Sequence, residues 1–285
     1  MREEGAKGAV VYRVFHFASG LWNRLLISNI SLISAGVAFY AMLALFPGLT
    51  ATIAIWSSVA DPTIISTYLE VADDFMPPEA FEIVQSQILA LLAMPKSAFS
   101  ISTLVSIAVA LFSARAGVGA LILGLNVIHG TRPRTTLASF LIGIVMTLAL
   151  VGVMLVALAT VVLAPILINL LPFHALGGWL MSGLPWIGML LLLLTALGIL
   201  YRYGPNAEFG RDPILSIGSL VATLVWSLAS LSLTYYLANF ASYNKVYGSI
   251  GAVIALLMWL YVSAFSILLG AAVNAEWAER RRDPQ

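Results

Sequence analysis

The residue with the clearest capacity for chemistry is Arg115, a permanent positive charge in the otherwise apolar stretch LFSARAGVGALILGLN at 111–126. It lies about 10–12 residues from the inner end of a predicted membrane span, which is roughly 15 Å at 1.5 Å per residue. A charge at this depth costs at least about 2.5 kcal/mol on insertion scales. The guanidinium is therefore expected to face protein or a water-filled cavity.

This position is compatible with two roles for Arg115. In a functional role, the guanidinium attracts an anionic group, such as a lipid phosphate, into a cavity between helices. In a structural role, it bonds to carbonyls freed near Pro47, or pairs with a carboxylate such as Glu208 or Glu276. The ligand site predicted for the functional role consists of Arg115, Asn126, Asn274, Arg202 and Arg211.

Small and polar residues share the helix face of Arg115, and the last span carries a similar stripe. At 100° per residue, Gly119, Ile122 and Asn126 lie within about 40° of Arg115. The stripe of the last span consists of Ser263, Gly270 and Asn274. We expect the two stripes to face a common interior.

Side chains that would mark an enzyme are scarce. The three histidines, His16, His129 and His174, lie on separate segments, and the chain has no cysteine. It contains no HExxH, GxSxG or P-loop motif, and the span interiors contain no Asp or Glu. The acids between 59 and 98 are read as a solvated outer face rather than a cation site. We therefore expect no enzyme activity, no metal and no cofactor.

The elements that must position these residues are membrane helices. Apolar residues make up 61% of the chain and charged residues 9%, whereas soluble domains carry roughly 25% charged residues. Since about 20 apolar residues cross the hydrocarbon core, the sequence predicts an all-α polytopic membrane protein with one membrane domain. The six predicted spans are about 29–58, 99–127, 137–163, 184–203, 214–238 and 249–273. Pro165 and Pro172 predict that the third apolar run breaks at the far surface.

The basic residues sort to one side of this topology. With six spans, eleven of the fourteen Lys and Arg residues fall on the same side. Four lie before the first span, two in the 128–136 connection, two in the 202–213 connection and three in the C-terminal tail. The positive-inside rule then places both termini in the cytoplasm.

Two segments outside the spans have patterns of their own. Apolar residues at helical spacing in 9–26 predict an amphipathic helix on the cytoplasmic surface, the alternative being a frayed start of the first span. The outer segment 59–98 is predicted to contain two short helices that flank DDFMPPEAF. The second, at about 79–93, would rest on the outer leaflet or cap a cavity.

Glycine and proline mark predicted structural positions. Pro47 lies inside the first span and is expected to kink it. Gly204, Pro205 and Asn206 end a helix by turn chemistry, and a gate or hinge role is the alternative. Three further glycines are expected to allow close helix contact, namely Gly248, Gly251 and Gly270.

Several motifs together carry a family resemblance: AFYAMLALFPGL at 38–49, YRYGPNAEFGR at 201–211, and the aromatic-Gly-Ser start of the last span with its LLMWLY continuation. In their order along the chain they resemble the YihY/BrkB family of bacterial inner-membrane proteins. The resemblance implies six spans, a link to virulence and, for some members, movement of lipid-like molecules or an old ribonuclease label. Ala272 stands where the family's motif has an acid, and SIGS at 216–219 replaces its usual Pro-Gly-Ala.

The sequence as a whole favours a transporter or flippase-like protein for a lipid or another amphipathic anion. Transport would be passive or gradient-coupled, because no ATP-binding motif is present. The alternative is a membrane scaffold or regulator of an envelope complex. A ribonuclease would need acid–base or metal groups and a basic binding surface, so we expect membrane lipids as partners and no nucleic acid.

Overall fold

The computed structural model describes residues 2–59, 78–92, 101–170, 177–206, 213–239 and 249–282. These residues form eight helices and no strand, which confirms the all-α prediction. Their bounds are α1 (Arg2–Ile27), α2 (Ile30–Val59), α4 (Pro78–Leu92), α5 (Ile101–Ile128), α6 (Thr136–Leu170), α7 (Gly177–Tyr203), α8 (Ile217–Asn239) and α10 (Ser249–Arg282).

Five of the described helices are long and apolar enough to cross a membrane by length and composition. Their candidate spans are Ile30–Thr50, Leu104–Ile128, Thr136–Val153, Ile217–Tyr236 and Gly251–Arg281. The predicted fourth span coincides with α7, where the apolar segment with described side chains is the shorter Ile187–Tyr203. Exposed leucines and valines cover these helices, as lipid-facing surfaces require. The chain is therefore a multi-pass membrane protein.

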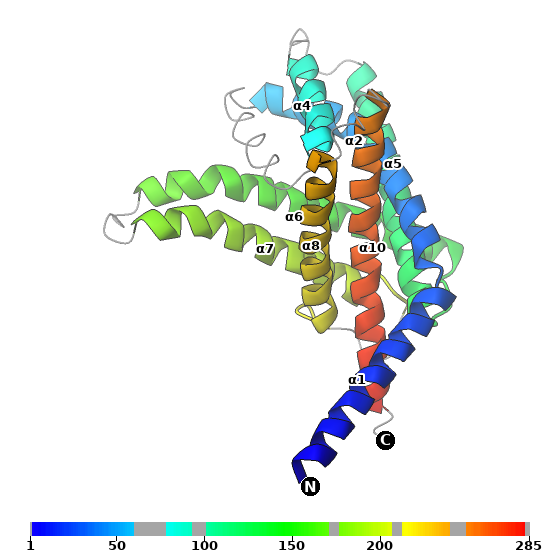
Figure 1. Ribbon diagram of the computed structural model, residues 1–285. Helices are drawn as coiled ribbons and strands as arrows, with labels where there is room; N and C mark the ends of the chain where they lie inside the picture. The colour runs from blue at the N-terminus through cyan, green and yellow to red at the C-terminus, as the bar shows by residue number, and fades with distance from the viewer. Residues whose placement is uncertain are drawn as a thin grey trace.

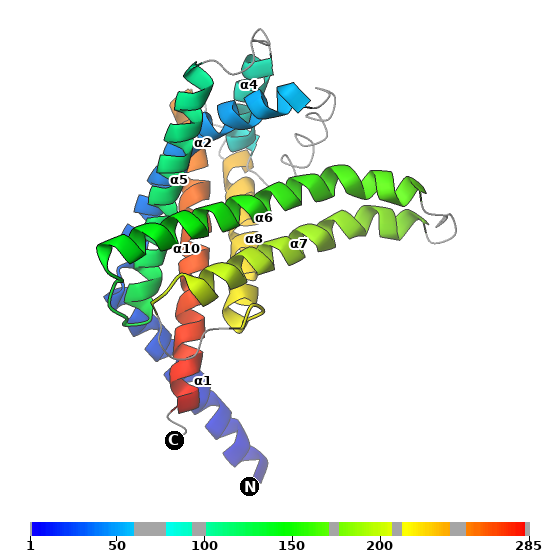
Figure 2. The ribbon, with the colours of Figure 1, turned by 180° about the vertical axis from the view of Figure 1, so that it is seen from behind.

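The helices are arranged as a bundle and a projecting hairpin. α2, α5, α8 and α10 run side by side, with α2 packed on α5 and α10, and α8 packed on α10. α6 and α7 pack on each other and cross the bundle, so that their far ends project away from it (Figures 1 and 2). Apolar side chains along α6, such as Val145 and Leu148, are exposed. Lipid gives such side chains no drive to fold back onto the bundle.

Prolines affect two long apolar helices, α2 and α6, differently. Thr50 Oγ1 donates to Phe46 O at 2.9 Å beside Pro47, a back-bond that bends helices. The last turns of α2 bend away from the bundle (Figures 1 and 2), which confirms the predicted kink. α6, in contrast, continues through Pro165 to Leu170, so the predicted break at Pro165 is wrong. Transmembrane helices tolerate proline where neighbouring groups satisfy the freed carbonyl.

Both ends of the chain lie at the same end of the bundle (Figure 1). α1 begins at Arg2, seven residues before the predicted start of this helix, and runs obliquely away from the bundle. A turn at Ser28 and Asn29 separates it from α2, with Asn29 at φ 48°. α10 continues to Arg282 rather than ending at 273. The structure places the two termini at the same end of the bundle, and that this end faces the cytoplasm stays a prediction.

The opposite end of the bundle carries α4, which packs on α10, α2 and α8. Its bounds, Pro78–Leu92, confirm the predicted helix at 79–93, and Val84 is buried. The first of the two short outer helices lies outside the described residues. The largest core cluster lies toward the end where the termini meet, and it includes Leu125, Ile128, Leu200, Tyr201 and Leu268.

Candidate functional site

Arg115 lies where α5 crosses α6. Its guanidinium carbon is 4.1 Å from the ring centroid of Phe140, within the range of a cation–π interaction. Gly143, one turn further along α6, has no side chain, and a Cβ there would come within 3.9 Å of Arg115 Cγ and Nε. The Nε atom is buried without a hydrogen-bond partner. An aromatic face and a small residue therefore accommodate the charge, but they do not neutralise it.

The structural partners predicted for Arg115 are engaged elsewhere or are not described. Glu276 pairs with Arg24 and Arg280, and Glu208 lies outside the described residues. Across the described part of the chain, every ion pair involves Arg24 or Arg280, and none involves Arg115. Arg115 thus differs from a structural arginine held by carboxylates.

The predicted common interior of the two small-residue stripes is wrong. The stripe on α5 faces α6, since Ile122 packs on Met146. The stripe on α10 faces α8, since a Cβ on Gly270 would overlap Gly218 O and approach Ala222. A helical periodicity identifies residues that share a face, but it does not identify the neighbour of that face.

Arg202 is another half-buried arginine, and none of the ion pairs among the described residues includes it. Its Nε is also buried and unpartnered, and its guanidinium carbon is 5.7 Å from the Tyr203 ring centroid. It lies in the last turn of α7. Arg211, also predicted to bind ligand, lies outside the described residues.

Asn126 ties the end of α5 to the turn that follows α7. Its side chain is buried, and Oδ1 accepts hydrogen bonds from Asn206 N at 2.7 Å and Thr131 Oγ1 at 3.0 Å. Asn206 Nδ2 in turn donates to Arg132 O at 3.0 Å. The structure therefore places Asn126 in a network between connections, about three helical turns from Arg115.

The Gly204-Pro205-Asn206 turn is held by side chains on both sides. Arg134 donates to Gly204 O at 2.7 Å and to Pro205 O at 2.8 Å. A Cβ on Gly204 would overlap Leu200 O and reach within 2.7 Å of Leu125 Cδ1. Guanidinium groups satisfy the carbonyls that a helix leaves free at its C-terminus. The turn thus has a defined structural role at the end of α7.

Asn274 plays a similar part at the start of α8. Ser216 and Ser219 bond each other's backbone N–H groups at 3.1 Å, a reciprocal cap of this helix. Asn274 Oδ1 accepts from Gly218 N at 2.7 Å, and its Nδ2 donates to Ser216 Oγ at 2.9 Å. The donors at this helix start therefore have partners within the chain.

The predicted glycine contacts are partly described. Gly270 packs against Gly218 and against Tyr201, whose hydroxyl donates to Ile267 O at 2.6 Å. These contacts confirm the close approach of α8 and α10 at Gly270. Gly251 is buried in the first turn of α10, and Gly248 lies outside the described residues.

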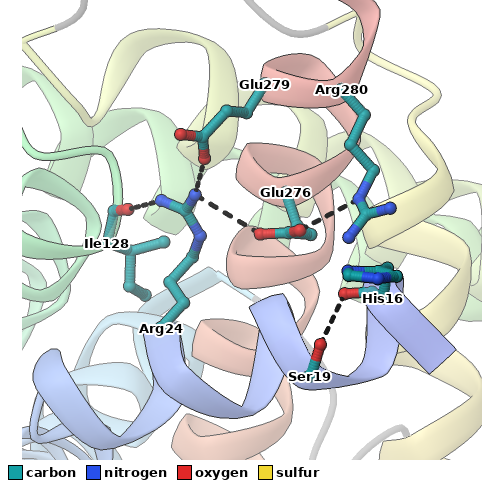
Figure 3. A network of polar contacts seen from close by, with 7 residues as sticks. All are labelled: His16, Ser19, Arg24, Ile128, Glu276, Glu279 and Arg280. Carbon is teal, nitrogen blue, oxygen red and sulfur yellow. Dashed lines mark hydrogen bonds and ion pairs between the residues drawn. The ribbon is translucent and has the colours of Figure 1, made fainter. Parts of the chain in front are cut away.

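Sequence reasoning missed a junction of α1, α5 and α10, shown in Figure 3. Arg24 donates to Ile128 O at 2.7 Å, contacts Glu276 at 3.5 Å and pairs with Glu279. Glu276, only 6% exposed, also accepts from Arg280 Nε at 3.0 Å. We call these four charged residues, Arg24, Glu276, Glu279 and Arg280, the α1–α10 junction. Arg24 and Glu276 are 252 residues apart, so no local pattern could pair them.

A Cβ at Gly20 would overlap the Glu276 carboxylate, so α1 approaches α10 closely at this point. Within the ranges described, no group of three or more His, Cys, Asp or Glu residues could hold a metal ion. Among the described residues, four charged side chains thus form a paired junction near the termini, whereas Arg115 on α5 and Arg202 on α7 have no ion pair.

Comparison with known proteins gives a consistent family match. The profile of the family described as virulence factor BrkB matches residues 21–285. YfkH of Bacillus subtilis, whose name calls it ribonuclease-like, is 28% identical over 262 residues, which cover 88% of this chain and 91% of that protein. A UPF0761 membrane protein of Aeromonas salmonicida is 25% identical over 91% of this chain and 88% of its own.

A shorter match carries a higher identity. A UPF0761 membrane protein of Tolumonas auensis is 34% identical over 110 residues, which cover 38% of this chain and 35% of that protein. No solved structure matches the chain.

Proposed function

The chain belongs to the BrkB virulence-factor family of membrane proteins, and from this premise we propose that it is a transporter or flippase-like protein for a lipid or another amphipathic anion. The observation that carries the proposal is Arg115. Its guanidinium lies in an apolar helix, stacks on Phe140 and keeps a buried Nε without a partner. An anionic head group would supply the missing partner.

The chemistry of the site favours a phosphate or carboxylate. Guanidinium groups bind such anions through two parallel N–H donors, and an interaction of this kind is stronger where water is excluded. Phe140 is 45% exposed and Phe112, one turn before Arg115, is 68% exposed. An amphipathic molecule could therefore approach Arg115 from the lipid side of α5 and α6.

The other candidate residues take different parts in this proposal. Arg202 is a second unpaired charge on the neighbouring helix α7, and Arg211 is proposed to extend the basic surface beyond it. Asn126 and Asn274 bond the helix ends that frame the site, so they act by positioning helices. Both termini are proposed to lie in the cytoplasm, with six spans in a bacterial inner membrane.

The energy source follows from what the sequence contains. No P-loop is present, and the predicted span interiors contain no Asp or Glu for a carboxylate proton relay. The proposed transport is therefore passive or driven by the gradient of the transported molecule. We do not extend the ribonuclease-like name of one relative to this chain, because Arg24 and Arg134 are engaged with protein groups.

A second candidate function is a scaffold or regulator of an envelope complex. The α6–α7 hairpin favours it, because the hairpin projects from the bundle and carries exposed apolar residues that a partner helix could cover (Figure 2). This function requires no ligand at Arg115, so the two candidates differ in the effect of removing that charge.

The test is a reconstituted lipid-movement assay. Purified protein enters vesicles with fluorescent phosphatidylglycerol or phosphatidylcholine, and dithionite reports the label that reaches the outer leaflet. We expect the wild-type protein to move phosphatidylglycerol faster than phosphatidylcholine. Arg115→Met should lower the rate of phosphatidylglycerol movement at least tenfold. Arg281→Met, at an exposed arginine of α10, is the matched control and should retain the rate.

Two results would count against the proposal. If lipid moves equally fast in vesicles with wild-type protein and in protein-free vesicles, the proposal of phospholipid transport is wrong and the scaffold function is favoured. If wild type and Arg115→Met move lipid at equal rates, transport does not depend on the Arg115 site.

A further inference from the structure

Helix α1 presents an exposed apolar strip on the side turned away from α10. Phe15 is 69% exposed, Trp22 64% and Leu26 59%. At 100° per residue, these three side chains lie within about 40° of one another. Tyr12, 65% exposed, lies at the border of the strip. Large apolar side chains gathered on one helix face mark an interaction surface.

A polar strip lies directly beside it. His16, Ser19 and Asn23 are outside the protein core, and they lie within about 60° of one another around the helix. The boundary between the two strips runs along α1 between Leu26 and Ser19, and Tyr12 lies just to its polar side. An aromatic residue with a polar tip at such a boundary is typical of the membrane–water interface.

The α1–α10 junction fixes how α1 is rotated. Gly20 faces the Glu276 carboxylate, Arg24 pairs with Glu276 and Glu279, and Phe17 lies edge-on to Trp277 with ring centroids 6.4 Å apart. At 100° per residue, Gly20, Arg24 and Phe17 lie on the side of α1 opposite the apolar strip, and Figure 3 shows Arg24 reaching from α1 toward Glu276 and Glu279. Contacts on that side therefore fix the orientation of the strip.

The strip leads toward the lipid-facing surface of α2. Leu26, a member of the strip, is 59% exposed in the last turn of α1, and Leu32 is 74% exposed after the Ser28–Asn29 turn. Phe39, 56% exposed, and Leu43, 46% exposed, continue the same face along α2. Since α2 is a candidate membrane span, the medium that covers this face is lipid.

We propose that α1 docks on the phospholipid bilayer at the boundary of head groups and acyl chains, with Phe15, Trp22 and Leu26 in the lipid and His16 and Asn23 in water. The α1–α10 junction sets the rotation of the docked helix. Because α1 leaves the bundle obliquely (Figure 1), insertion is deepest at Leu26 and decreases toward Tyr12. This proposal is independent of transport.

The experiment uses the absence of cysteine from the chain. Nitroxide labels are attached to single variants of the full-length protein in phospholipid vesicles: Phe15→Cys and Leu26→Cys on the apolar strip, and His16→Cys and Asn23→Cys on the polar strip. Collision with oxygen reports lipid, and collision with a water-soluble nickel complex reports water. Leu32→Cys on α2 serves as the lipid-exposed reference and reports correct insertion.

We expect the oxygen-to-nickel collision ratio to be several-fold higher at 15 and 26 than at 16 and 23, and higher at 26 than at 15. Adding Arg24→Met should reduce the contrast between the strips at least twofold, while Leu32→Cys keeps its lipid signal. Nickel access at all four positions would overturn the proposal. Exclusion of both reagents at 15 and 26, with spin–spin broadening, would overturn it in favour of a second copy of the chain.

Discussion

Two arginines, Arg24 and Arg115, have opposite relations to their surroundings. Arg24 lies at the end of the bundle near water, and its guanidinium contacts a backbone carbonyl and two carboxylates from two other helices. Arg115 lies within an apolar helix with an aromatic ring on one side, and no carboxylate of the described residues pairs with it. The Nε atom of each arginine is buried without a hydrogen-bond partner, so the difference lies in the ion pairs. The same side chain is thus paired at one site and unpaired at the other.

The difference separates a structural charge from a candidate ligand site. Removing one member of a buried pair is costly, because the other charge remains buried and uncompensated. Removing an unpaired charge from an apolar environment leaves no such charge behind, and it relieves the cost of placing the charge there. Stability measurements should therefore show a clear loss for Arg24 and little change for Arg115, whereas transport measurements should depend on Arg115 and not on Arg24.

The largest expected effect is that of Arg24→Met. The substitution keeps the aliphatic length but leaves Ile128 O and part of the Glu276 carboxylate without a donor. We expect the free energy of unfolding to fall by about 2–4 kcal/mol. This is less than for a fully buried ion pair, because Glu276 keeps its contact with Arg280 and Glu279 is 65% exposed. Thermal unfolding in detergent measures it against Arg281→Met. A change no larger than that of this control would mean that the α1–α10 junction does not hold the helices together.

A smaller effect is expected from a single methyl group at Gly20. In Gly20→Ala the Cβ would overlap the Glu276 carboxylate, so either this carboxylate or α1 must shift. Both shifts weaken the contacts between Glu276 and the arginines, at a cost of about 1–3 kcal/mol. Gly36→Ala is the matched control, because it lies inside α2 with open space around its Cβ position. The control should be neutral or stabilising by up to about 1 kcal/mol. Equal effects of the two substitutions would contradict the close approach at Gly20.

Much of the fold was predictable because membrane helices carry a strong local signal. Long apolar runs predicted α2, α5, α8 and most of α10 within a few residues of their starts, since about 20 such residues are needed to span the hydrocarbon. Pro47 predicted its own kink. The continuation of α10 to Arg282 was missed because charged residues end an apolar run, although here they bond to α1 and to each other.

The arrangement of the helices was less predictable. Lipid is as apolar as the side chains of α6, so no hydrophobic pattern on α6 or α7 specifies that this hairpin crosses the bundle. For the same reason, the sequence identified Arg115 as an unusual charge but not Phe140 as its neighbour. The pairing of Arg24 with Glu276 depends on tertiary structure alone, because 252 residues separate them.

The contact of Arg115 with Phe140 gives a third, smaller effect. A cation over an aromatic ring contributes about 0.5–2 kcal/mol, more where water is excluded. We expect Phe140→Leu to lower the free energy of unfolding by about 1 kcal/mol when Arg115 is present, and by much less in an Arg115→Met background. A double-mutant cycle by thermal unfolding isolates this coupling. Full additivity of the two substitutions would show that the ring does not stabilise the charge.

The smallest expected change in stability is that of Arg115→Met itself. No ion pair is broken, the lost cation–π contact is offset by the removal of a charge from an apolar site, and the net change should lie within about 1 kcal/mol of zero. Thermal unfolding is again the measurement, with Arg24→Met as the contrasting substitution. A loss as large as that of Arg24→Met would make Arg115 a structural residue. A stable Arg115→Met protein that no longer moves phosphatidylglycerol would identify Arg115 as a group retained for its ligand, because the fold would not depend on it.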